Sequence, residues 1–186
     1  MEAVHEQRAE TLAELAHLRS RTRGTLRSFW FPLVLFGGLT LASAPLYAIG
    51  GAAVGVFWLV AAPAGIVATS RYYRRRELRL GIEGPTAPYV ATGIAIALAA
   101  WLTGALGGEE VSTYGPSLAI AAGTLVFAAL DRSAALAGVA AGLVAAAAAV
   151  ALAGVGTAAA PLLAAAFGAG YLIAGLLFRR DERQRG

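Results

Sequence analysis

The sequence has no cysteine and no lysine among its 186 residues, and only 14% of its residues are charged. The lack of cysteine excludes disulfides, thiolate metal ligands and thiol nucleophiles, and it leaves the redox compartment unreadable. The two histidines, His5 and His17, lie near the amino terminus and do not have the spacing of a metal site. We therefore expect no metal and no cofactor.

Ionisable side chains are also missing from the interiors of the apolar stretches that follow Phe29. Charged groups within a membrane are costly, and where they occur they usually mark ion paths, proton relays or catalytic sites. Membrane enzymes acting on lipid phosphates or prenyl chains need acidic clusters for a metal or histidine for acid–base chemistry. Neither is available here, so the sequence predicts a protein that is not an enzyme.

Apolar residues are present in excess, at 58% of the chain. A helix needs about 20 residues to cross the hydrocarbon of a bilayer. Lipid cannot satisfy exposed backbone groups, and the alternation of a membrane β-barrel is missing, so the spans must be helices. We predict an all-α, polytopic membrane bundle of six transmembrane helices, at 29–48, 52–70, 88–106, 115–130, 133–153 and 158–178. The fourth is short, and we expect it to extend into its flanks.

All 15 basic residues are arginines, and the predicted spans place every one of them on the same side of the membrane. Five precede the first span, five follow the second, one lies between the fourth and fifth, and four follow the sixth. Positive charge marks the cytoplasmic side. We therefore expect a multi-pass protein of the plasma (cytoplasmic) membrane with both termini in the cytoplasm, ending in a basic tail at 179–186.

Three acids lie near the ends of the predicted spans. Asp131 lies in the turn before the fifth span, where we expect Asp131 or Ser133 to cap that helix by accepting a hydrogen bond from its first amides. Glu109 and Glu110 belong to the longest connection on the opposite side. We expect these two glutamates in a solvated loop.

Glycines spaced four residues apart let helix backbones approach closely in membranes. Gly138 and Gly142 are the best such pair, because the fifth span is built almost wholly of alanine, glycine and valine. We expect this pair to serve helix packing inside the chain, with a homo-oligomer as the alternative.

The polar amino-terminal tail, residues 1–28, has a helical pattern. On a helical wheel its leucines gather on one arc, while glutamates recur every four residues along the far face. We predict a cytoplasmic amphipathic helix that binds a partner protein, the inner leaflet or the chain's own basic loop, with a solvated extension of the first span as the alternative. The predicted partner-binding residues are Glu6, Glu10, Leu12, Glu14, Leu15 and Leu18.

The arginine cluster after the second span is expected to continue that helix until Gly81. Clustered arginines just inside a span attract anionic lipid by about 1 kcal/mol each. Binding of nucleic acid would need a folded reading domain, for which the chain has no room, so we expect no direct contact with nucleic acid. The predicted contacts with anionic lipid are Arg71, Arg74, Arg75, Arg76 and Arg79.

Two short segments carry a resemblance. Ser28-Phe29-Trp30-Phe31-Pro32 opens the first span, and Arg71-Tyr72-Tyr73-Arg74-Arg75-Arg76 closes the second. They resemble a group of uncharacterised six-span integral membrane proteins of actinobacteria, over the first half of the chain. Such proteins are often encoded beside a winged-helix transcriptional regulator, so the resemblance implies a regulator as a possible partner. It implies no catalytic residue.

These features predict a non-enzymatic integral membrane protein that anchors, or signals to, a cytoplasmic protein through residues 1–27 and the basic loop. The alternative is a small oligomeric permease or channel for a neutral or apolar solute. The glycine- and alanine-rich fifth span favours it, as do Pro63 and Pro161, because proline can bend a helix.

Overall fold

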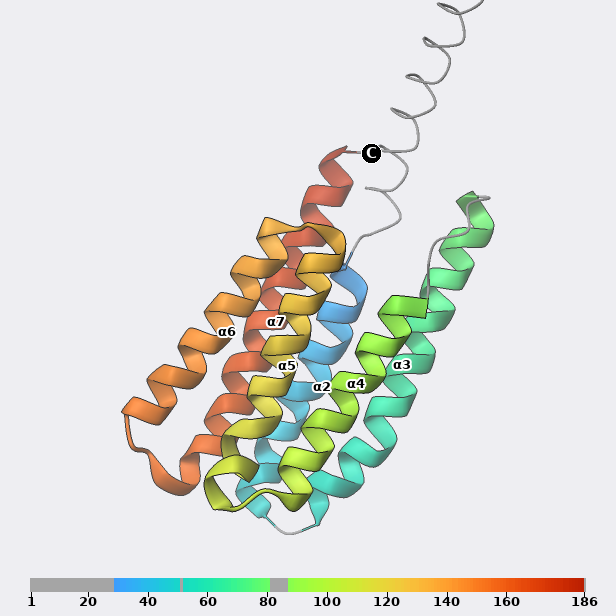
Figure 1. Cartoon of the computed structure of the whole chain (residues 1–186). Helices are drawn as coiled ribbons and strands as arrows, with labels where there is room; N and C mark the ends of the chain where they lie inside the picture. The colour runs from blue at the N-terminus through green and yellow to red at the C-terminus, as the bar shows by residue number, and fades with distance from the viewer. Residues whose placement is uncertain (1–28, 51, 81–86, 186) are drawn as a thin grey trace, which may run out of the picture.

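The computed structural model describes residues 29–50, 52–80 and 87–185, which are helical almost throughout (Figure 1). The long helices are α2 (Trp30–Ile49), α3 (Ala53–Leu80), α4 (Ala87–Leu106), α5 (Glu109–Asp131), α6 (Ala134–Leu152) and α7 (Ala159–Arg185), with a short 3-10 helix, η1 (Gly156–Ala158), before α7. In this part of the chain six helices are long and apolar enough to cross a membrane. The predicted all-α, six-span fold is confirmed, whereas the predicted amino-terminal helix lies outside the described residues.

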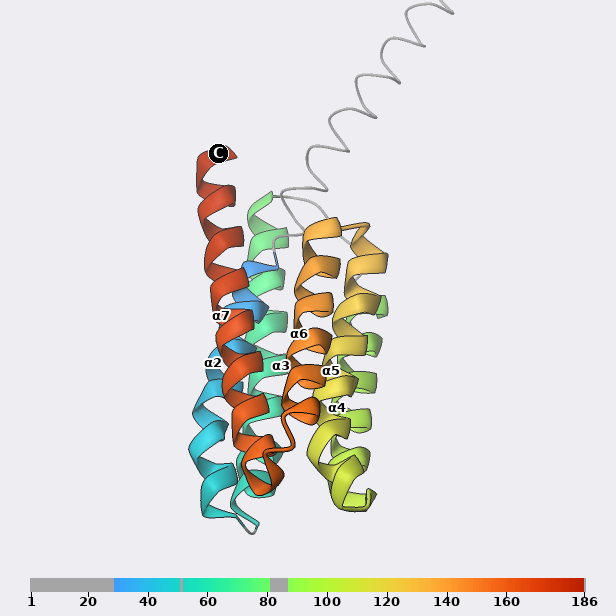
Figure 2. The ribbon, with the colours of Figure 1, turned by 90° about the vertical axis from the view of Figure 1, so that its left-hand side faces the viewer.

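The helices follow one another around a ring that closes where α2 packs along α7. Figure 2 shows the ring as two layers, with α2, α3 and α7 on one side and α4, α5 and α6 on the other. The contact between α2 and α7 is the most extensive. Helix α3 packs on α2 and α4 packs on α5, whereas the consecutive helices α3 and α4 hardly touch each other. The weakest seam of the ring therefore lies between α3 and α4.

Glycines allow the closest approach of two helices, which occurs between α2 and α7. A Cβ atom built at Gly168 would lie 2.5 Å from the backbone nitrogen of Leu41, and one built at Gly37 would lie 2.8 Å from the backbone nitrogen of Leu172. Gly175, seven residues after Gly168, meets α2 in the same way. Small residues are a common basis of helix association in lipid, because they bring backbones into van der Waals contact.

The prediction that Gly138 and Gly142 pack inside the chain is wrong. Both glycines lie on an exposed face of α6, and nothing in the rest of the described chain lies within 4 Å of a Cβ atom built at either position. Small residues line both faces of this helix, so its composition did not reveal which face packs inward. The face that does is formed by Leu136, Ala140, Leu143 and Ala147.

The connection between α4 and α5 is shorter than predicted. The fourth span does extend into its flank, because α5 begins at Glu109, so Glu109 and Glu110 form its first turn instead of a solvated loop. The amino-terminal end of a helix carries partial positive charge, which favours acidic side chains there. Only Gly107 and Gly108 separate this helix from α4.

Two further helix ends bear on the predictions. Ser133 caps α6, since its hydroxyl accepts a hydrogen bond from the amide of Leu136 at 3.2 Å. Asp131 is instead the last residue of α5, so the expectation of a cap is met by the serine alone. Pro161 lies in the first turn of α7, where the missing amide hydrogen breaks no helical hydrogen bond, so it is not a bending point. Pro63 does lie inside α3.

Candidate functional site at the arginine end

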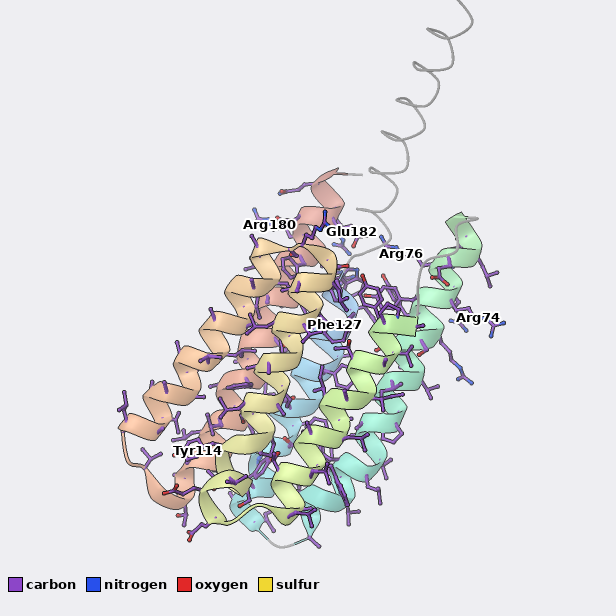
Figure 3. The ribbon with its side chains drawn as sticks, in the orientation of Figure 1. Arg74, Arg76, Tyr114, Phe127, Arg180 and Glu182 are labelled. Atoms are coloured by element: carbon purple, nitrogen blue, oxygen red, sulfur yellow. The ribbon has the colours of Figure 1, made fainter. Side chains whose placement is uncertain are left out.

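Every arginine side chain that the structure describes lies at one end of the bundle, which we call the arginine end (Figure 3). It is formed by the last turns of α3 and α7, the turn between α5 and α6, and the starts of α2 and α4. Helices α3 and α7 have 28 and 27 residues, more than the roughly 20 that cross a bilayer. Both therefore continue beyond the apolar region, as predicted for the segment that precedes Gly81.

An ion pair joins the two projecting helices. The guanidinium of Arg76 donates to a carboxylate oxygen of Glu182, and it also donates to the hydroxyl of Tyr72 at 3.1 Å. The two side chains of the pair are only 16% and 30% exposed. The pair links α3 to α7, and removal of either partner would leave the other charge partly shielded from water without a counter-charge.

Arg76 thus differs from the other arginines of α3 that were predicted to contact lipid. Its side chain points toward the bundle, whereas the side chain of Arg74 points away from it (Figure 3). The remaining predicted lipid contacts are exposed like Arg74: Arg71, Arg75 and Arg79. The sequence pattern did not distinguish the inward arginine, because Arg74, Arg75 and Arg76 are consecutive and only the position of α7 decides which of them meets Glu182.

Aromatic rings tie the start of α2 to both projecting helices. Tyr72 stacks on Phe31 with 4.2 Å between ring centroids, and it meets Trp30 edge-on at 5.7 Å. The guanidinium carbon of Arg179, on α7, lies 4.9 Å from the centroid of the Trp30 ring. A cation over a tryptophan face is attracted by the ring's quadrupole, which makes the face partially negative.

A second cluster joins α2, α4 and α5 at the same end. The rings of Phe29, Tyr89 and Phe127 lie 6.0–6.3 Å from one another. The hydroxyl of Tyr89 donates to a carboxylate oxygen of Asp131 at 2.5 Å. Asp131 therefore ties α5 to α4, where the sequence had suggested a helix cap.

Hydroxyl groups supply most of the polarity deep inside the bundle. Thr124 of α5 and Tyr171 of α7 are hydrogen-bonded through their hydroxyls and almost fully buried. The hydroxyl of Thr124 also donates to the carbonyl of Ile120 at 2.8 Å. Thr40 of α2 is buried too and donates to the carbonyl of Phe36 at 2.7 Å. These are neutral groups with hydrogen-bond partners, so they impose little penalty on the membrane interior.

The helices that carry Thr40 and Thr124 share a spacing that the sequence analysis missed. Thr40-Leu41 follows Pro32 at the same distance as Thr124-Leu125 follows Pro116. Both threonines are buried and donate to the carbonyl four residues earlier. A position-by-position comparison of the first and fourth predicted spans would have found this shared spacing from the sequence alone.

The exposed arginines give the arginine end a positively charged surface, above the ion pair and the aromatic rings. Among residues 29–50, 52–80 and 87–185, no three histidine or acidic side chains come together as a metal site would require. The tail residues predicted to bind a partner lie outside the described residues: Glu6, Glu10, Leu12, Glu14, Leu15 and Leu18.

We compared the chain with models of protein families, with curated proteins and with solved structures, and found no match. The function is therefore argued from the chain's own residues.

Proposed function

We propose that this protein is a non-enzymatic membrane anchor or signalling partner for a cytoplasmic protein, which binds at the arginine end. The observation that supports this proposal is the ion pair between Arg76 and Glu182, which holds two helices together beyond the apolar region. A fixed platform loses little conformational freedom on binding a partner, and preorganisation of this kind favours affinity. Positive charge marks the cytoplasmic side, so we place this end and both termini in the cytoplasm, at the plasma membrane.

The exposed positive charge of the arginine end defines the kind of partner that would fit it. Arg71, Arg74, Arg75 and Arg79 are exposed on α3 and favour a protein with an acidic surface, since complementary charge speeds encounter and selects the partner. Helix α2 begins at the same end, and we propose that the tail, which precedes it in the sequence, contributes its predicted leucine arc and glutamate stripe to binding the same partner. The resemblance to actinobacterial six-span proteins would fit a transcriptional regulator in this role. No direct contact with nucleic acid is proposed.

The proposal is tested by a pull-down in mild detergent from the native host, with the tagged full chain beside a version that lacks residues 2–24. We expect a specific soluble protein to co-purify with the full chain and to be lost with the tail. Arg74→Gln/Arg75→Gln should weaken its recovery, because it removes two exposed charges without touching the ion pair. Recovery of the same soluble proteins with all three versions would contradict the proposal.

A second candidate function is a small oligomeric permease or channel for a neutral or apolar solute. The buried hydroxyls of Thr40, Thr124 and Tyr171 support it, because they place neutral polar groups deep between the helices. The exposed glycines of α6, Gly138 and Gly142, would then serve contact between copies of the chain.

Solute flux tests this second function separately. Proteoliposomes holding the full chain should take up glycerol faster than empty liposomes, as measured by stopped-flow light scattering. Thr124→Val should change the rate, because it removes the hydroxyl that Tyr171 contacts. Equal rates with and without protein, over a panel of neutral solutes, would count against a permease.

A further inference from the structure

The last turns of α7 separate their charges by helix face. Glu182 lies on the side that faces α3, where Arg76 pairs with it. Arg180 lies on the outer side (Figure 3), Arg183 lines the same hollow three residues later, and both are exposed. Of the two acids in this segment, Glu182 is thus engaged on the opposite face, while Asp181 is exposed and offsets only one of the arginine charges. The outer face of α7 carries an excess of positive charge as a result.

A hollow on this outer face is lined by Leu176, Arg179, Arg180, Arg183 and Gln184. These positions are three or four residues apart along the helix, so they form one continuous strip of its surface. Three guanidinium groups and one amide surround the hollow, and every one of them is a hydrogen-bond donor. Trp30 of α2 holds Arg179 at one edge through the ring contact at 4.9 Å. The hollow is therefore formed by α7 alone, and a contact with α2 positions one of its arginines.

Farther along α7, toward the middle of the bundle, the same strip becomes apolar. Leu176 forms the floor of the hollow and is 54% exposed, and Ile173, one turn earlier, is 60% exposed. Both face outward in a helix long and apolar enough to cross a membrane, where the surroundings are acyl chains. Positive charge thus lies directly above an apolar track, at the depth where the helix leaves its apolar region.

We propose that this hollow binds the headgroup of an anionic glycerophospholipid. Its phosphate lies between Arg180 and Arg183, with Arg179 beside it, and its acyl chain runs along Leu176 and Ile173. The planar fork of an arginine matches the geometry of phosphate oxygens, and basic pockets at the ends of membrane helices take anionic headgroups. A soluble anion would use the arginines and leave the apolar track uncovered, so the two features together specify a lipid. This site is on α7 and does not depend on the proposed partner-binding function.

The test uses Trp30 as the reporter, because its ring lies against Arg179 at the edge of the hollow. Trp58→Phe and Trp101→Phe leave Trp30 as the single tryptophan of the full chain. The protein is reconstituted in two sets of vesicles. In one set the phosphatidylglycerol is brominated in the upper acyl chain, and in the other set the phosphatidylcholine is brominated at the same position. Quenching of the Trp30 fluorescence is measured as a function of the brominated fraction. Comparison of the two sets gives the preference for the anionic lipid.

We expect a clear preference for phosphatidylglycerol over phosphatidylcholine, which Arg180→Gln/Arg183→Gln reduces by about 25-fold, at about fivefold for each arginine. The matched control is Arg132→Gln, compared with Arg180→Gln alone: each removes one exposed arginine at the same end of the bundle, and the control should leave the preference unchanged. An equal drop in these two single variants would overturn the site, because it would reflect net charge alone. Displacement of the lipid by inorganic phosphate would overturn the assignment to a lipid.

Discussion

Gly168→Ala is expected to destabilise the folded bundle by about 1–3 kcal/mol, and Gly168→Leu by more. The added methyl group would lie 2.5 Å from the backbone nitrogen and 2.8 Å from the Cα atom of Leu41. A flexible side chain can move aside, but a helix backbone cannot, so α2 and α7 would have to separate. This contact closes the ring, and therefore its loss affects the whole bundle rather than one helix end.

The matched control for this substitution is Gly142→Ala, which has the same chemistry on a helix face where the added methyl group meets nothing. It should be neutral or stabilising by up to about 1 kcal/mol, since alanine is the better helix former. The measurement is the unfolding midpoint in mild detergent, followed by loss of the monodisperse peak on size exclusion. If the two alanine variants unfold at the same temperature, the close approach of α2 and α7 is not what holds the ring closed.

Arg76→Glu is expected to destabilise the bundle by about 1.5–3 kcal/mol, the range found for hydrogen bonds to charged groups. The substitution removes the hydrogen bond to the Tyr72 hydroxyl and puts a second carboxylate beside Glu182. Glu182→Arg should destabilise in a similar way, by placing two guanidinium groups together. The double variant, Arg76→Glu/Glu182→Arg, restores opposite charges and should recover a large part of the loss.

This double-mutant cycle is measured by SDS-induced unfolding of the detergent-solubilised protein, which gives a free energy for each variant. We expect a coupling energy of about 0.5–3 kcal/mol. Arg75→Glu is the control, because this neighbour is exposed, and surface substitutions usually change stability by less than about 0.5 kcal/mol. A coupling energy of zero would show that α3 and α7 do not act as one platform, and the proposed function would lose its main support.

Much of the architecture could be predicted because it depends on local properties of the chain. The number and approximate positions of the spans follow from the lengths of the apolar stretches, and the short fourth stretch was correctly expected to extend. The boundary at Glu109 was missed, because an acidic pair reads as a loop unless its favourable interaction with a helix start is considered. The continuation of α3 to Leu80 was expected from a run of residues without glycine or proline.

The candidate site was only partly predictable. The arginine clusters were found from composition alone, but the inward orientation of Arg76 and the bond between Tyr89 and Asp131 depend on residues far apart in the chain. The glycine prediction failed for a related reason. Spacing of four drew attention to Gly138 and Gly142, whereas the two glycines of α7 that pack most closely on α2, Gly168 and Gly175, are seven residues apart.

The sequence by itself determined that six helices form, approximately where they lie, apart from the start of α5 and the end of α7, and at which end of them the arginines gather. It could do so because hydrophobic length, helix capping and charge near the membrane are properties of contiguous segments. Only the tertiary structure decided which glycines bring helices together, which arginine is paired with an acid, and which arginines remain exposed. Those outcomes depend on the rotation of each helix about its own axis, and in helices apolar on every side this rotation is set by the neighbouring helices.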